Sequence, residues 1–319
     1  MRCRDLFAFT LLAVPACAAG HKPDTTGTTS SDITTAVPKA EWIDIQTGST
    51  MPLDTTTSPS MPPPPTCQGG PPAMFAAMSA QIMGGSNGVL GGVLGTVQAI
   101  TQSPPAAMTQ DHAVWGPLVA PNDPIVHKLD IQRVADNTFH FVLSGKPIPA
   151  DDSAWVGMFQ GDITTPDAQH AAGDVEIDFG AIHALDPSSN PVAGAIAIHF
   201  AAAPDSRAID ETFAGIAGQM APQPNNAHYA FAQDGTGTRF EFVTQADFDH
   251  DGVADELLDV QALFAPDGSG KASTTVTGGA LGTNSVSAIE CWDNQQRVLF
   301  YADSTNTNPP AGNPACCTM

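Results

Sequence analysis

Apolar and polar residues alternate along most of the chain between residues 125 and 304. In 238–244 and again in 257–264, apolar side chains occupy every second position, and an acidic turn separates the two stretches. A period of two residues places one face of a strand against a core and the other against water. About ten such stretches, separated by Gly, Pro, Asp and Asn, predict a mainly β protein.

Short strands joined by tight turns favour an antiparallel meander. Closing the meander as a barrel, or folding it as a sandwich, would limit unpaired strand edges. We therefore expect a meander barrel or sandwich of about ten strands, with one or two short helices. Residues 205–220 predict one of these helices, because four apolar side chains there have helical spacing: Ile209, Phe213, Ile216 and Met220.

Residues 68–110 contain no charged side chain. Met74, Met78 and Ile82 lie four residues apart, as on one face of a helix, and a Gly-rich run follows at 84–95. We expect a short helix and a Gly-rich connection, both packed on the β domain. One alternative is a membrane-inserted helix, because small residues at four-residue spacing allow close helix packing in lipid. The other alternative is disorder.

The chain starts like an exported protein. Two arginines precede a short apolar stretch at 6–14, which is typical of a signal peptide and too short to span a bilayer. Residues 14–17, Val-Pro-Ala-Cys, resemble a bacterial lipobox, although Pro15 departs from its pattern. The resemblance implies loss of residues 1–16, lipidation of Cys17 and, because Ala18 is not aspartate, an outer-membrane location. The alternative is ordinary secretion after cleavage at 16–18.

The expected domain plan is based on composition. Residues 17–66, rich in Thr, Pro and Ser, should form a lipidated N-terminus and disordered tether, because they cannot bury enough apolar surface. Residues 67–122 are the Gly-rich helical and linker segment, 123–304 the β domain, and 305–319 a Cys-containing tail. Residues 290–301 and this tail resemble the closing strand of bacterial lipoproteins, a resemblance that implies no activity.

The formal net charge is -22, from 33 acidic and 11 basic residues. A negative field of this size repels nucleic acid and attracts divalent cations. Nucleic acid is therefore excluded as a partner. The expected partners are a membrane, reached through the lipid anchor, and an unidentified protein or small-molecule ligand.

Four cysteines remain if Cys3 is removed and Cys17 is lipidated: Cys67, Cys291, Cys316 and Cys317. An even number in an exported chain predicts two disulfides. Adjacent cysteines rarely bond to each other, because the bridge strains the peptide. We therefore expect one of the tail cysteines to pair with Cys291 and the other with Cys67.

The acidic turn contains a candidate calcium site. Asp247, Asp249, Asp251 and Asp255 occupy positions 1, 3, 5 and 9 of a D-x-D-x-D-G-x-x-D pattern, and the Val253 carbonyl stands at position 7. Calcium binds six to eight oxygens, and this spacing can supply several. The loop resembles those of EF-hands and thrombospondin type 3 repeats, which implies weak binding of about 0.1–1 mM. Position 12 is Leu258 rather than glutamate, so the alternative is a solvated hairpin turn.

The sequence shows no catalytic constellation. Residues 84–88 match G-x-S-x-G, but a nucleophile elbow requires a preceding strand, which the Gly-rich run does not supply. Residues 267–271 lack the first glycine of a phosphate-binding loop. Asp174, Glu176 and Asp178 share the wet face of one predicted strand, and the histidines are scattered.

These observations favour a non-enzymatic envelope lipoprotein that displays a β-rich binding or structural domain, with a weak calcium site. Two alternatives stay open. One is an exported hydrolase whose site is not recognisable in the sequence, and convergent titratable groups in a cleft would favour it. The other is a barrel-like carrier of an apolar ligand, which an apolar cavity would favour.

Overall fold

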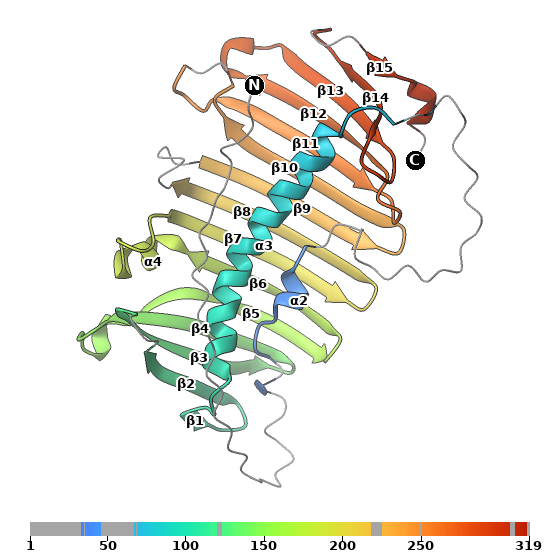
Figure 1. Ribbon diagram of the computed structural model, residues 1–319. Helices are drawn as coiled ribbons and strands as arrows, with labels where there is room; N and C mark the ends of the chain where they lie inside the picture. The colour runs from blue at the N-terminus through green and yellow to red at the C-terminus, as the bar shows by residue number, and fades with distance from the viewer. Residues whose placement is uncertain are drawn as a thin grey trace.

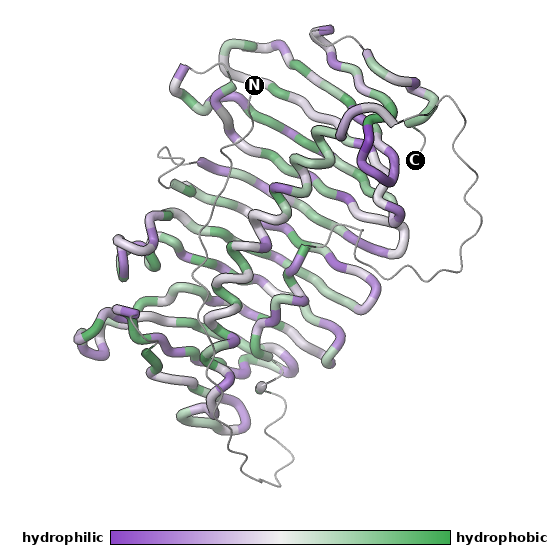
Figure 2. The backbone as a smooth tube through the Cα atoms, in the orientation of Figure 1, coloured by the Kyte–Doolittle hydropathy of each residue, from purple (hydrophilic) through white to green (hydrophobic). Residues whose placement is uncertain are grey.

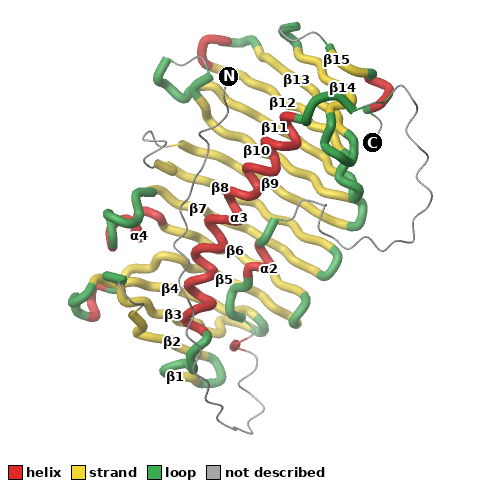
Figure 3. Tube along the Cα trace, in the orientation of Figure 1, coloured by secondary structure: helices red, strands yellow, loops and turns green. Residues whose placement is uncertain are grey.

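The computed structural model describes residues 33–34, 36–45, 67, 69–119, 123–217, 225–248, 251–306 and 310–317. Within these residues, fifteen strands form one antiparallel sheet in which each strand pairs with its neighbours in sequence (Figure 1). A 28-residue helix, α3 (Met74–Thr101), crosses one face of this sheet diagonally, and the short helix α2 (Ala40–Ile43) lies beside it (Figure 3).

The strands are mostly eight to twelve residues long, and the two edge strands are the shortest. Their bounds are β1 Ala107–Met108, β2 His112–Val119, β3 Ile125–Ala135, β4 Thr138–Pro147, β5 Val156–Asp167, β6 His170–Asp178, β7 Ala193–Ala203, β8 Ser206–Ala217, β9 Asn225–Asp234, β10 Gly237–Ala246, β11 Glu256–Phe264, β12 Gly270–Gly278, β13 Ser285–Trp292, β14 Val298–Asp303 and β15 Ala311–Gly312. A third helix, α4 (Phe179–Leu185), connects β6 to β7.

The mainly β class and the antiparallel meander are confirmed, but the expected closure and strand number are wrong. The first and last strands do not pair, so the sheet is open, and it has fifteen strands rather than about ten. Neither barrel nor sandwich is needed, because a helix covers the apolar face. The exposed edges are limited in another way: β1 and β15 are only two residues long, which leaves little backbone for unwanted pairing.

Alternation along each strand separates an inner face, which packs under the helices, from an outer face in water, and Figure 2 shows how the hydropathy of the residues changes along the strands. The inner face is apolar and rich in aromatic rings. Its buried side chains include Leu129, Ile131, Phe141, Phe159, Ile177, Ile198, Phe200, Tyr229, Phe231, Phe240, Val260, Phe264 and Trp292.

Helix α3 is continuous, which corrects the expectation of a short helix followed by a Gly-rich connection. Its buried side chains recur every three or four residues along its whole length: Phe75, Ser79, Met83, Ser86, Leu90, Leu94, Val97 and Ile100. Six glycines weaken the helix by roughly 1 kcal/mol each relative to alanine, and burial of this stripe against the sheet offsets that weakness. No helix in the described part of the chain is both long and apolar enough to cross a membrane.

The helix expected at 205–220 is also wrong, because residues 206–217 form strand β8. Ile209 and Glu211 are buried and Phe213 is partly buried, all on the inner face, while Asp210 and Thr212 are exposed. The carboxyl group of Glu211 occupies an inward position, and this obscured the alternation of apolar and polar residues in the sequence of β8.

The boundaries of the folded part differ from the domain plan. Within 17–66, Trp42 and Ile43 are buried in the common core, next to α3 and β7. The sheet already begins inside 67–122, with β1 and β2, and it ends inside 305–319, with β15. Apolar side chains in these segments complete the cover and extend the sheet. Residues 1–16 and Cys17 lie outside the described residues.

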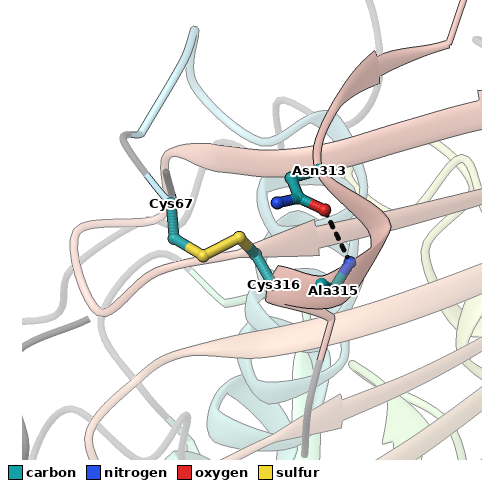
Figure 4. Close-up of a disulfide and its surroundings, with 4 residues drawn as sticks. All are labelled: Cys67, Asn313, Ala315 and Cys316. Carbon is teal, nitrogen blue, oxygen red and sulfur yellow. Dashed lines mark hydrogen bonds between the residues drawn. A yellow bond between two sulfur atoms is a disulfide. The ribbon is translucent and has the colours of Figure 1, made fainter. Parts of the chain in front are cut away.

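Two disulfides fasten the end of the sheet, as the cysteine pattern predicted. Cys67 bonds to Cys316, and Cys291 bonds to Cys317. Figure 4 shows the first bond, beside the turn in which the Asn313 side chain accepts a hydrogen bond from the backbone N–H of Ala315. The segment leading into α3 is thereby tied to the tail, and the tail to β13.

The exposed glycines of α3 provide a test of this packing. Gly91 faces open space, so a methyl group there meets no neighbour within 4 Å, and Gly91→Ala should raise the free energy of unfolding by about 1 kcal/mol. Gly173→Ala is the matched control: on β6 its methyl group would lie only 2.5 Å from the carbonyl oxygen of Asp162, and it should destabilise. Urea unfolding of both variants checks the pair, and a destabilised Gly91→Ala would contradict a helix held by its inner stripe.

Candidate functional site

The predicted calcium loop lies between β10 and β11, and its carboxylates bind its own backbone. The Oδ1 atom of Asp247 accepts a hydrogen bond from the N–H of Asp251 at 3.1 Å, and its Oδ2 atom accepts from Gly252 at 3.0 Å. The Oδ1 atom of Asp251 accepts from the N–H of Val253 at 2.8 Å. Gly252 has a φ of 93°, a left-handed conformation that glycine adopts without strain. Asp249 lies outside the described residues.

The carboxylate after the loop faces inward. Glu256 is buried, and its Oε2 atom accepts a hydrogen bond from the N–H of Phe248 at 3.0 Å. Asp255 is exposed and directly precedes β11. The described residues contain no group of three or more His, Cys, Asp or Glu side chains arranged to hold a metal ion. The calcium site at Asp247, Asp249, Asp251, Val253 and Asp255 therefore stays a prediction.

The outer face carries paired histidines and aspartates. His140 lies 2.9 Å from Asp162, and His199 lies 2.8 Å from Asp174 on the neighbouring strand. Similar pairs join His112 to Asp130 and His228 to Asp210. All are solvent-exposed, and such pairs contribute little stability. They give the outer face its polar character but enclose no site.

A buried polar contact joins α3 to the centre of the sheet. The Ser86 hydroxyl oxygen lies 2.8 Å from one carboxyl oxygen of Glu211 and 2.7 Å from the other. Glu211 is on β8 and is only 1% exposed. Burial raises its pKa from 4.5 to about 7, an effect that the Ser86 hydrogen bond opposes and the neighbouring Asp210 reinforces.

Tyr229 completes this cluster. It lies directly opposite Glu211 on β9, and its ring packs edge-on against Phe240 and Phe242. Its buried hydroxyl lies near Ser86, but no described residue meets ordinary hydrogen-bond geometry with it. Burial, together with the nearby Glu211, raises the pKa of Tyr229 above its usual range, so the phenol stays neutral.

A second buried carboxylate holds the N-terminal end of α3. Glu290, on β13, accepts hydrogen bonds from the N–H groups of Met74 and Phe75, at 3.0 and 2.6 Å. Residue 73, the N-cap, is an alanine and cannot cap these groups with its side chain, so the sheet supplies the acceptor that a free helix end lacks. Burial raises the pKa of Glu290, and the two N–H groups oppose that shift.

Helix α3 is also tied to the segment before it. The N–H of Ile45 donates to the Asn87 side chain at 2.8 Å, and the Asn87 amide donates back to the Ile45 carbonyl at 2.6 Å. Ser86 and Asn87, adjacent in sequence, thus bind the sheet and α2's flank respectively. The interruption of the apolar run by these two polar residues has a structural cause.

Neither sequence motif forms a catalytic arrangement. Ser86 lies in the interior of α3, not at a strand-to-helix turn, and it faces a carboxyl group and a phenol without a histidine. Residues 267–269 form the turn between β11 and β12, where the Asp267 side chain binds the N–H and hydroxyl of Ser269. The first motif joins α3 to the sheet, and the second forms a turn.

Sequence reasoning missed Glu211 and Glu290 as buried carboxyl groups that bind α3. Both occupy inward positions of strands, Glu211 between Ile209 and Phe213, and Glu290 between Ala288 and Trp292. A charged residue at an inward position of an otherwise alternating strand is the signal that could have found them, because such a group must have a buried partner.

No protein-family model matches this chain, and neither a curated protein nor a solved structure is significantly similar to it.

Two serines on the same helix face test the buried contact. Ser86→Ala leaves the Glu211 carboxyl buried without a partner, and should lower the free energy of unfolding by about 1–3 kcal/mol at pH 5. Ser79 is fully buried too, but its hydroxyl has no partner among the described residues. Ser79→Ala should therefore be neutral or stabilising. Urea unfolding compares them, and equal effects would mean that the Ser86 contact adds nothing.

Proposed function

We propose that this chain is a non-enzymatic envelope lipoprotein that displays a β-rich domain for binding or for a structural role. The observation that carries the proposal is the occupied inner face of the sheet. Helix α3 and the segment around α2 belong to the same buried cluster as the strands beneath them. An apolar face filled by the chain's own helices supports display of a stable domain over transport of an apolar ligand inside it.

The surface hollows support the same proposal. The larger has a volume of about 680 Å³ and lies near the ends of strands β7 to β12, and the smaller, of about 370 Å³, lies on β12, β13 and β14. Neither is lined by a residue of α2 or α3. These are open surface depressions, and the carboxyl groups with raised pKa, Glu211 and Glu290, lie elsewhere, between helix and sheet.

The disulfides favour an exported protein, because such bonds persist in oxidising compartments. Together with the lipobox-like residues 14–17, they support anchoring through Cys17 at an outer membrane. The anchor itself lies outside the described residues. In this proposal the membrane is the partner of the N-terminus, and the outer face of the sheet is the displayed surface.

Replacing the lipid attachment residue tests the anchor. Cys17→Ser should move the protein from the membrane fraction to the soluble fraction, because the thiol that would carry the acyl chains is gone. Ala18→Ser, which keeps the thiol, is the control and should stay with the membrane. Fractionation followed by immunoblotting measures both, and membrane association of Cys17→Ser would refute the anchor.

We also propose that the 247–255 loop binds calcium weakly. Calorimetry on the full chain should give a Kd of about 0.1–1 mM, and saturating calcium should raise the melting temperature, because binding to the native state stabilises it. Asp247→Asn should abolish both effects. Asp267→Asn, in a turn whose carboxylate binds only Ser269, should leave them intact. Absence of heat and of a thermal shift in the unaltered protein would reduce the loop to an acidic turn.

A further inference from the structure

The Ser86–Glu211 contact holds a buried carboxyl group against a single hydroxyl group. Both carboxyl oxygens lie within 2.8 Å of the one hydroxyl oxygen, a distance typical of O–H···O hydrogen bonds. A serine hydroxyl has one hydrogen, which it can donate to one carboxyl oxygen or share between the two. Two separate hydrogen bonds form when the Glu211 carboxyl group is protonated and donates to the Ser86 oxygen, while the serine hydroxyl donates to the other carboxyl oxygen.

No described residue directly opposite Glu211 carries a positive charge, and Arg207, four residues earlier on the same face of β8, donates instead to the carbonyl oxygen of Asp44. On β7, Ile198 lies opposite it, and on β9 Tyr229 does. Helix α3 contains no charged residue. The next residue, Asp210, points to the outer face, where it pairs with His228, and its charge disfavours ionisation further. A buried carboxylate without a cation is costly, so the neutral acid is the form that fits this site.

The middle of α3 is the part of the cover that depends most on this contact. The N-terminal end is held by Glu290 and, through residues 67–73, by the Cys67–Cys316 bond. The C-terminal end leads into β1, where the N–H of Ala106 donates to the Val114 carbonyl. Between them, Gly84, Gly85 and Gly88 surround Ser86, and glycine favours the helix least of all residues but proline.

We propose that Ser86 and Glu211 form a proton-operated latch that seats the middle of α3 on the sheet, and that loss of the Glu211 proton frees this part of the helix and uncovers the apolar face beneath it. No bond is made or broken other than the O–H bond of the carboxyl group, whose proton passes to water. The latch does not depend on the membrane anchor or on calcium.

The direction of the pH effect is set by the two pKa values. The Glu211 pKa is about 7 when the helix is seated, and 4.5 when the group is exposed to water. The seated form therefore binds the proton more tightly. Its advantage is fully present below about pH 4.5, is lost as the pH rises to about 7, and stays lost above that. Between pH 5 and pH 8, the opening constant should rise roughly seventyfold.

Amide hydrogen exchange tests the latch. Peptides that cover residues 82–95 are followed by mass spectrometry at pH 5, 6, 7 and 8, and the rates are corrected for the intrinsic pH dependence of exchange. The expected result is the roughly seventyfold rise in opening for these peptides, with no comparable rise in peptides from β6 and β7. An equal rise in the strands would mean global unfolding and would overturn the proposal.

Glu211→Gln keeps the shape of the side chain and its hydrogen bond to Ser86, but it removes the proton that titrates. Its opening should be independent of pH, and close to that of the unaltered protein at pH 5. Glu176→Gln, which changes an exposed carboxylate on β6, should keep the full pH dependence. Persistence of the pH effect in Glu211→Gln, or its absence in the unaltered protein, would overturn the latch.

Ser86→Ala provides a second measurement that remains decisive if Glu211→Gln does not fold. The Ser86 hydrogen bond lowers the pKa of Glu211, so its removal should raise the pH above which the opening constant stops increasing. A merely structural serine would change the opening constant by the same factor at every pH and leave that pH in place. That outcome would count against the latch.

Discussion

The structure depends on one requirement: the apolar face of an open fifteen-stranded sheet has to be covered. A closed barrel covers its inner face by curvature, and a sandwich by a second sheet. Here a single helix, with the segment around α2, performs that task, and both belong to the same buried cluster as the strands. Removing α3 from its place would therefore expose much of the core at once, which makes its attachment points the decisive contacts of the fold.

The attachment points are polar, although the surface they hold is apolar. Hydrophobic contact alone would let a Gly-rich helix slide or rotate on a broad sheet, because such contact has no direction. Glu290 fixes the beginning of α3, Ser86 and Glu211 fix its middle, and Asn87 fixes the neighbouring segment. The carboxyl groups of Glu290 and Glu211 are buried and the Asn87 contact is partly buried, so a displaced helix would leave polar groups without partners away from water. Direction and register are thus specified by three hydrogen-bonded contacts.

Local periodicity was enough to predict most strands, whereas features that depend on distant partners were missed. The alternating stretches around Leu129, Phe141 and Val260 were identified as strands because the pattern lies within a few residues. Strand β8 was mistaken for a helix, because Glu211 occupies an inward position that its partner on α3 makes tolerable. The length of helix α3 was underestimated, because the low helix propensity of glycine is a local property, whereas the sheet that stabilises the helix is distant in sequence.

The open form of the sheet could not be predicted either, since the alternation of apolar and polar residues does not reveal which element covers the inner face. Of the candidate site, the acidic turn at Asp247 and Asp251 was placed correctly between two strands, but the buried carboxylates were not found.

The pairing of the two adjacent tail cysteines has a consequence for the order of assembly. Cys316 and Cys317 follow every strand of the sheet in sequence, and yet they fasten the segment before α3 and strand β13. During synthesis or export, neither fastening can be made until the whole sheet has emerged. A chain interrupted before Cys316 would lack the native partners of Cys67 and Cys291. The two native disulfides can therefore form only after every described strand of the sheet has been made.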